Sequence, residues 1–349
     1  GFFGGIYVDA GLLTIFEGSS QTQTPESEIR AANPFPELVE FFDSLKLDEL
    51  NELDRSHIPA PAIFYKARQQ VAEQLQKEAS SLRMESIPAI RQQISEIKGP
   101  REGRGYAEAS SKIYSMISPI TPTATLDVFD MLPEVGDVQT PFWQIVRACK
   151  TFYDRHGVIP HYGGCPDIET STAFYQRMRN IYQKKGEADK EEIRTILREQ
   201  GVTNIDEVIL SRLLKNVWRI SAINYKPIET YLLQRPKPDA NEYAISSVQV
   251  CLLALRSFVE KHDRQPNESD NQEIEQIANE LSGGNVDQTE LSNYLKQLFV
   301  SKGEVLPSVV ATISAIAAQE VTKIIIQQSQ PIKGFFIYNG LTQYGKTLW

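Results

Sequence analysis

Cysteine, histidine and dense basic runs are scarce in this chain of 349 residues. Its three cysteines form an odd set without the spacing of a disulfide framework, which is typical of a reducing cytoplasmic or nuclear setting. The formal net charge is −9 and Lys and Arg form no cluster, so we expect no nucleic-acid partner. No basic leader followed by an apolar core is visible, so the sequence predicts no secretion signal.

Motifs that bind phosphate or metal are also lacking. The sequence contains neither G-x-G-x-x-G nor the Walker pattern, so we expect no nucleotide loop and no cofactor bound by this chain. His156, His161 and Cys165 lie in one short stretch, but a fourth ligand is missing, so we expect no metal site. Cys165 precedes Pro166 and a helix start, where a nucleophile could lie, yet no base is identified beside it. We therefore predict no catalytic residue in this chain.

What the sequence does contain is a helical middle between strand-like ends. Hydrophobic residues make up 41% and charged residues 23%, the balance of an ordinary globular protein. Residues 2–8 and 12–16 alternate as strands and predict a hairpin, and residues 335–339 and 341–348 predict a second one around an Asn-Gly turn. From Pro34 onward the apolar period changes to that of helices.

The expected helices begin after Pro34-Phe35-Pro36 and continue for more than two hundred residues. They span residues 61–79, 87–97, 107–117, 141–156, 171–185, 190–200, 205–218, 244–262, 271–281 and 288–299. Polar or Pro-rich composition predicts loops at 18–33, 120–140 and 234–242. A short pattern from Ala148 to Pro160 recurs from Ala254 to Pro266 at a constant offset, which fits either a duplication or two similar amphipathic helices.

One long apolar helix is expected at residues 307–328, because Pro307 suits a first helical position. Its large apolar residues fall near one broad face: Val309, Ile313, Ile316, Val321, Ile324 and Ile325. A row of small residues lets another backbone come close: Ala311, Ser314, Ala315 and Ala318. Glu320 and Lys323 would each cost about 2.5–3.5 kcal/mol near a bilayer centre. We therefore expect a buried helix of a soluble protein and no membrane partner.

Five segments in order carry a resemblance to a known family. They are residues 1–4 with the strands after them, N-P-F-P-E-L at 33–38, Phe142-Trp143 with Ala148 and Phe152, the Pro166-Asp167 turn with the tyrosine-rich helix to Asp189, and Ala318-Gln319-Glu320-Val321 with Lys323 and the closing hairpin to Thr347. Together they resemble the regulatory, non-cysteine subunit of the heterodimeric activating enzyme of neddylation, in the ThiF-type adenylation family. The resemblance extends over nearly the whole chain.

The resemblance implies an obligate heterodimer in the cytoplasm and nucleus. The partner subunit would hold ATP and Mg, adenylate the ubiquitin-like modifier and carry it as a thioester on a cysteine. This chain would support those steps, while the start of its nucleotide fold, with an arginine lent to the partner's ATP site, would precede Gly1. Where the family has Gly-Gly in the closing helix this chain has Ser314-Ala315, so the backbones there approach less closely.

We therefore expect an α/β chain in which a partial Rossmann-like adenylation fold, built from both chain ends, is interrupted by a large all-helical insertion. Residues 1–33 would end the first fold segment, 34–304 would form the insertion, as a degenerate counterpart of a catalytic-cysteine domain, and 305–349 would close the fold. The predicted interface with the partner consists of Ala311, Ser314, Ala315, Ala318, Gln319, Glu320 and Lys323. Two alternatives stay open: a self-sufficient activating enzyme that uses Cys165, and a helical scaffold unrelated to modifier activation.

Overall fold

The computed structural model describes residues 3–8, 10, 12–15, 26–47, 49–98, 103–117, 121–136, 139–225, 243–283, 287–300, 304, 306–326 and 329–348. The chain divides into two compact units. The terminal unit comprises Gly1–Ile15 with Ala222–Trp349, and the helical unit comprises Phe16–Ser221. The predicted domain boundaries, after residues 33 and 304, differ from the limits of these two units, and the predicted division into domains stays a prediction. The protein is mixed, mostly helical with few strands, as an α/β chain allows.

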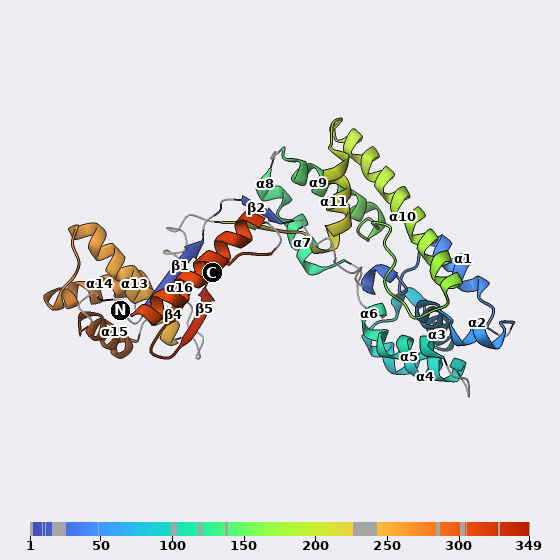
Figure 1. The fold of residues 1–349 in the computed structure, drawn as a ribbon, viewed down its shortest axis with the longest axis horizontal. Helices are drawn as coiled ribbons and strands as arrows, with labels where there is room; N and C mark the ends of the chain where they lie inside the picture. Colours follow the sequence, from blue (N-terminus) through green and yellow to red (C-terminus); the bar gives the residue numbers. More distant parts are fainter. Residues whose placement is uncertain are drawn as a thin grey trace. The chain divides into compact units, whose positions relative to one another are not determined.

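The terminal unit is organised by an antiparallel sheet of three strands in the order β1, β4, β5 (Figure 1). These strands are β1 (Phe3–Val8), β4 (Gly334–Asn339) and β5 (Tyr344–Leu348). The register pairs Phe3 with Asn339 and Val8 with Gly334, so the two ends of the chain meet in one sheet. The prediction that strands from both ends share a domain is therefore confirmed.

The predicted N-terminal hairpin is wrong. Strand β2 (Leu12–Ile15) pairs with β3 (Ser221–Asn224), a strand that the sequence analysis did not predict, while β1 pairs with β4. Alternation identified β1 and β2 as strands, but it contains no information about which strand pairs with which. Leu13 and Ile15 are buried in a small cluster with Ile223, which explains this pairing.

Helices cover opposite faces of the three-stranded sheet. Tyr7, Phe335 and Ile337 belong to a core cluster built mainly from α13 (Tyr243–His262), α14 (Asn271–Ser282) and α15 (Gln288–Val300). Ile6 instead packs against a second cluster, which contains Val8, and Ile324 of α16 (Pro307–Ile326) packs against the same cluster. Because Ile6 and Tyr7 are adjacent in β1, their side chains point to opposite faces. Helix α16 therefore covers one face at β1 and the α13 cluster covers the other.

The helical unit has its own large core. Its helices are α1 (Pro36–Ser44), α2 (Glu52–Ser56), α3 (Ala60–Gln74), α4 (Ile87–Lys98), α5 (Arg104–Ser111), α6 (Ile113–Ile117), α7 (Thr123–Asp130), α8 (Leu132–Val135), α9 (Pro141–His156), α10 (Thr172–Glu199) and α11 (Glu207–Asn216). Short 3-10 turns lie at Glu26–Ile29, Ala79–Ser81, Met84–Ser86 and Val217–Arg219, and a fifth precedes α14 at Glu268–Asp270. The core packs α1, α3, α4, α5 and α6 against the first half of α10.

Local chemistry explains several helix limits. The predicted bounds of α9 are confirmed: Pro141 lies in its first turn and Gly157, with φ 69°, ends it in the left-handed conformation that glycine adopts readily. The predicted helices 171–185 and 190–200 are one continuous helix, α10. Gly186 lies within it, and a Cβ there would come 2.4 Å from the Gly163 nitrogen. This glycine permits a close backbone contact and does not break the helix.

Two predicted loops are also corrected. Residues 120–140 contain α7 and α8, and Val128 and Phe129 of α7 are buried, so the prolines and threonines there flank helices. The polar stretch 18–33 contains the turn Glu26–Ile29, with Glu28 and Ile29 buried. The predicted loop 234–242 lies outside the described residues.

The repeated sequence pattern has matching side-chain contacts. Phe152 and His156 lie with ring centroids 4.3 Å apart at the end of α9, and Phe258 and His262 lie 4.4 Å apart at the end of α13. Each histidine Nε2 lies within 2.9 Å of a glutamate on a following helix, Glu192 in one case and Glu273 in the other. The similarity therefore extends from the sequence to the contacts at both helix ends.

A buried polar cluster in the helical unit was missed by the sequence analysis, which considered His161 only as a metal ligand. His161 is 1% exposed; its Nδ1 accepts the N–H of Gly163 at 2.9 Å, and its Nε2 donates to the carbonyl of Glu28 at 3.2 Å. Its backbone N–H donates to Asp189 at 2.8 Å. Burial, with the nearby Arg30 guanidinium, lowers the pKa of His161 to about 3. The imidazole is therefore a neutral structural link between the Glu28 turn and α10.

This link predicts acid sensitivity of the helical unit. The histidine of the unfolded chain takes up a proton near pH 6.5, whereas folded His161 does so only near pH 3. The contribution of His161 to the free energy of unfolding is therefore complete above pH 6.5 and is lost as the pH falls from 6.5 toward 3. The free energy of unfolding should fall by up to about 1.4 kcal/mol per pH unit from this group. In His161→Gln, which keeps a donor without the titration, urea unfolding midpoints should depend less steeply on pH than in the wild type. His156→Gln, at an exposed histidine, is the control, and an unchanged slope in His161→Gln would contradict the assignment.

Candidate partner-binding surface on α16

Helix α16 is less buried than the sequence predicts. In this chain only Val309 and Glu320 of α16 are buried among its described side chains. Val321 is 55% exposed and Ile325 is 76% exposed, although the helical pattern placed both on the packed face. The expectation of a buried helix is therefore wrong for this chain alone. Its pattern misled us because apolar residues occur on all sides of α16, so periodicity does not identify the packed side.

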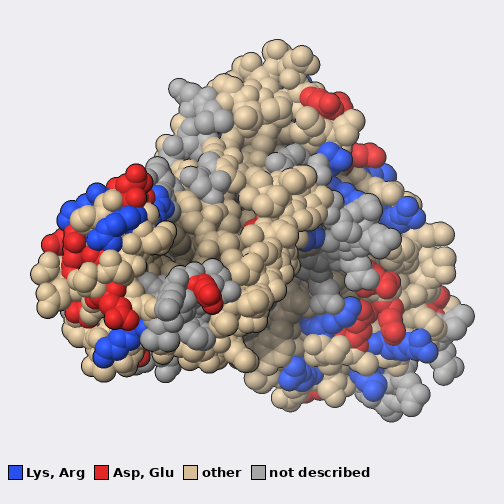
Figure 2. Space-filling model, turned by 60° about the vertical axis from the view of Figure 1, so that its left-hand side comes forward, with Lys and Arg blue, Asp and Glu red and all other residues tan. Residues whose placement is uncertain are grey.

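The row of small residues lies on the surface. Ala311, Ser314, Ala315 and Ala318 are all exposed, and so is Gln319. Figure 2 shows a broad surface without charged side chains beside the charged part of the terminal unit. The only charged residues of α16 are Glu320 and Lys323. The uncharged side of α16, defined by Val310, Ala311, Ser314, Ala318, Val321 and Ile325, is called the α16 face below.

Glu320 points inward and anchors the end of the helix. Its side chain is 4% exposed; Oε1 accepts from Lys323 Nζ at 2.6 Å and Oε2 accepts from the backbone N–H of Ile332 at 2.6 Å. A buried carboxylate is stable only when such partners replace water. Of the seven predicted interface residues, Glu320 is thus an internal link, while five lie on the surface and Lys323 is half-buried. Their role in binding a partner stays a prediction.

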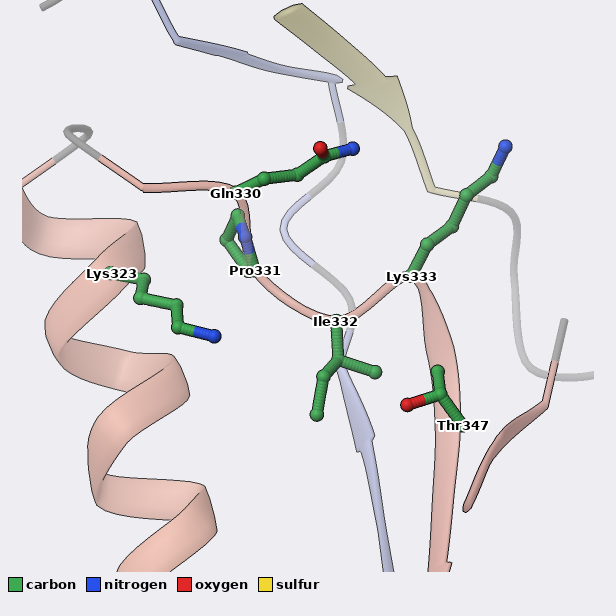
Figure 3. Close-up of a pocket in the computed structure, with 6 residues that line it drawn as sticks. All are labelled: Lys323, Gln330, Pro331, Ile332, Lys333 and Thr347. Atoms are coloured by element: carbon green, nitrogen blue, oxygen red, sulfur yellow. The ribbon is translucent and has the colours of Figure 1, made fainter. Parts of the chain in front are cut away.

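A shallow pocket lies beside this link (Figure 3). It has a volume of about 450 Å³ and is lined by Lys323, Gln330, Pro331, Ile332, Lys333 and Thr347. Lys323 extends from α16 toward Ile332, whereas the Lys333 side chain points away from Lys323 and Thr347 lies beyond Ile332 as seen from the helix (Figure 3). The sequence analysis missed this pocket because its lining comes from a helix, a connection and an edge strand.

By length and composition, α16 could cross a membrane. The mean hydropathy of an 18-residue stretch of the helix is 1.6, and 11% of that stretch is buried. Its contacts favour a protein environment instead. Glu320 connects α16 to the segment before β4, and Ile324 packs against the cluster that contains Val8 of the sheet. A spanning helix would have to carry this linked carboxylate into hydrocarbon. We therefore interpret the α16 face as a protein-packing surface.

The environments of the three cysteines disfavour the thiolate form. Burial raises the pKa of the Cys165 thiol to about 12, although Arg179 opposes this shift, and its Sγ donates to the Pro166 carbonyl at 3.5 Å. Cys149 and Cys251 are buried, and burial raises the pKa of both thiols. A nucleophilic cysteine needs the opposite shift.

The residues considered for a metal site have other partners. His156 lies against Phe152 and Glu192, and His161 is enclosed by its hydrogen bonds to Glu28 and Gly163. Across the described ranges, no group of three His, Cys, Asp or Glu residues could hold a metal ion.

Comparison with known proteins gives a consistent set of relatives, although no protein-family model matches the chain. The NEDD8-activating enzyme E1 regulatory subunit AXL of Arabidopsis thaliana is 26% identical to this chain over an alignment of 353 positions, which covers 92% of this chain and 66% of that protein. The regulatory subunit of Caenorhabditis elegans is 22% identical over 94% of this chain and 68% of its own length. The regulatory subunit of Xenopus laevis is 25% identical over 99% of this chain and 70% of its own length.

These relatives define a class, the regulatory subunits of enzymes that activate a ubiquitin-like modifier. Within that class, the chain is homologous to regulatory subunits of the NEDD8-activating enzyme, which confirms the resemblance drawn from its residues. It spans 66% of AXL and 64% of the related Arabidopsis subunit AXR1, slightly less than two thirds of each.

The Glu320 link generates a stability prediction. Glu320→Ala leaves the Ile332 N–H and the Lys323 ammonium without their carboxylate, and an unpaired buried polar group costs about 1–3 kcal/mol. We expect the free energy of unfolding of the terminal unit to fall by about that amount in denaturant titrations. Gln319→Ala, one position away and exposed, should change it by less than about 0.5 kcal/mol. Equal stability of the two variants would show that the link contributes little.

Proposed function

We propose that this chain is a regulatory subunit of a heterodimeric enzyme that activates a NEDD8-like modifier with ATP. The observation that carries the proposal is the match to AXL over 92% of the chain. ATP and Mg would bind to the partner subunit, which would adenylate the modifier and hold it as a thioester on its own cysteine. The chain itself would act in the cytoplasm and nucleus, without nucleic acid or membrane.

The fold supports a structural role in that reaction. The three-stranded sheet and α16 would be the closing part of a Rossmann-like adenylation fold, and the helices between residues 34 and 304 its insertion. The cysteines support the division of labour, because burial raises the pKa of all three thiols and a thioester site needs a ready thiolate.

We further propose that the α16 face binds the partner subunit. Its small residues allow a close backbone approach, while Val321 and Ile325 offer apolar area that water now contacts. Such a mixture of small side chains and exposed apolar anchors is suited to helix packing. The face would be covered once the heterodimer forms.

Co-purification tests this proposal. When the chain is co-expressed with a tagged catalytic subunit of the NEDD8-activating enzyme, the two should elute together in size-exclusion chromatography. Ala318→Arg places a long charged side chain on the α16 face and should weaken pairing by at least about tenfold. Ala173→Arg, at an exposed alanine of α10, is the matched control and should pair normally. Failure of the wild-type chain to co-elute would overturn the proposed function, and normal pairing of Ala318→Arg would overturn only the proposed surface.

A thioester assay separates this proposal from a self-sufficient enzyme. With ATP, Mg and the modifier, a non-reducing gel should show the thioester on the catalytic subunit, and Cys165→Ala should leave its amount unchanged, because burial keeps the Cys165 thiol protonated. A thioester on this chain that disappears in Cys165→Ala would favour the enzymatic alternative. Thioester formation that needs no copy of this chain would favour the scaffold.

A further inference from the structure

Large and small side chains follow a symmetrical order along one stripe of α16. The stripe has steps of four, four, three, four and four residues, which keep its positions within about 100° of arc around the helix. We call it the α16 stripe, and it consists of Leu306, Val310, Ser314, Ala317, Val321 and Ile325. Leu306 belongs to it because its carbonyl accepts the first helical hydrogen bond, from the Val310 N–H at 3.1 Å. Large residues lie at both ends of the stripe and two small ones at its middle.

The large side chains of the stripe are in contact with water. Their exposed fractions are 37% for Leu306, 45% for Val310, 55% for Val321 and 76% for Ile325. The buried side chains of α16, Val309 and Glu320, lie on another side of the helix. No charged residue belongs to the stripe. Such a surface gains free energy when a second apolar surface covers it.

The order of side-chain sizes is the same when the stripe is read backward. Reversal places Leu306 opposite Ile325, Val310 opposite Val321 and Ser314 opposite Ala317. A contact between identical copies across a two-fold axis requires this property, because each residue of one copy meets its counterpart on the other. In an antiparallel pair the large residues meet at both ends, and the small ones let the helices approach at the centre. The helix dipoles then also run in opposite directions, which is favourable.

The size and charge of the stripe indicate a weak, reversible contact. A helix of 20 residues such as α16 is about 30 Å long and about 10 Å across, so two facing helices bury roughly 600 Å². Stable interfaces bury about 1,200–2,000 Å². Two copies that each carry a net charge of −9 also repel one another, and the uncharged stripe is where they meet with the least repulsion. The contact is therefore populated only at high protein concentration.

We propose that two copies of this chain associate weakly through their α16 stripes, as an antiparallel pair with its two-fold axis between Ala315 and Ile316. This pair is called the self-pair below. The inference rests on the proposed function, because the stripe shares Val310, Val321 and Ile325 with the α16 face that the catalytic subunit would cover. The self-pair and the heterodimer therefore exclude each other. A regulatory subunit without its partner covers its apolar helix in this way until the catalytic subunit replaces the second copy.

Sedimentation velocity of the full chain over a range of concentrations tests the self-pair. The wild type should change from monomer to dimer and form no larger species, because a two-fold contact closes at two copies. Salt should strengthen the self-pair, since it screens the repulsion between two acidic chains. Val321→Glu should weaken it by at least about tenfold. Gln319→Glu adds the same charge on another exposed side of α16 and should dimerise as the wild type does.

Disulfide cross-linking tests the antiparallel register. Val310 of one copy should lie beside Val321 of the other, whereas the two copies of Val310 would be about 16 Å apart along the helix axis. Two cysteines are bridged only when their Cα atoms lie within about 7 Å. A mixture of Val310→Cys and Val321→Cys chains should therefore form a linked dimer under mild oxidation. Each variant alone should give no more linked dimer than the wild type.

The outcomes separate the self-pair from the proposed function. A wild type that stays monomeric, or equal dimerisation of Val321→Glu and Gln319→Glu, would overturn the self-pair. Cross-linking of Val310→Cys alone, as strong as in the mixture, would overturn the antiparallel register. A self-pair that persists within the complex with the catalytic subunit would overturn the exclusion.

Co-elution with the catalytic subunit is measured on the same preparations. If no self-pair forms while the catalytic subunit still co-elutes, the proposed function stands and the self-pair fails. If the self-pair forms as expected but no catalytic subunit binds, the proposed function fails and the self-pair stands.

Discussion

The backbone ladder between β1 and β4 is the interaction on which the terminal unit depends. It joins residues 3–8 to residues 334–339, a separation of more than three hundred positions, and β4 then carries β5. Closing so long a loop costs conformational entropy before any contact is gained. The ladder forms because its two faces are covered by different helices, with Ile6 toward α16 and Tyr7 toward α13. The packing of these helices and the strand pairing therefore stabilise each other.

This dependence explains what the sequence could predict. Helix α9 follows from local signals, since Pro141 and Gly157 mark its ends and the apolar period fills the space between them. Strands β1 and β2 were also identified from local alternation, whereas their pairing depends on distant strands, so the hairpin prediction failed and the partner strand β3 was missed. Helix α10 shows the same limit: Gly186 weakens a helix intrinsically, but its tertiary contact with Gly163 requires glycine there. Local signals were read correctly at the ends of α9 but not at α7 and α8, where prolines and threonines that flank helices were taken for a loop.

The candidate site divides in the same way. Composition identified α16 and its two charged residues, but apolar residues occur on all sides of the helix and did not show which side faces the sheet. Glu320 illustrates the difficulty. From the sequence, a lone carboxylate in an apolar helix fits a role at an interface as well as a role as a buried internal link. Only the fold shows that Oε2 reaches the Ile332 N–H twelve positions later. The pocket was beyond prediction because Thr347 reaches it from the edge strand.

The exposure of α16 connects stability with assembly. Fully burying a side chain such as valine or isoleucine stabilises by about 1.5–3 kcal/mol, and Val321 and Ile325 have most of that stabilisation still to gain. A partner that covers them binds the folded terminal unit and not the unfolded chain, so binding raises the apparent stability of that unit. Glu320 links this helix to the sheet, because it accepts the Ile332 N–H in the segment that leads into β4. Stabilisation of α16 would therefore also favour the position of the segment that leads into the central strand of the sheet.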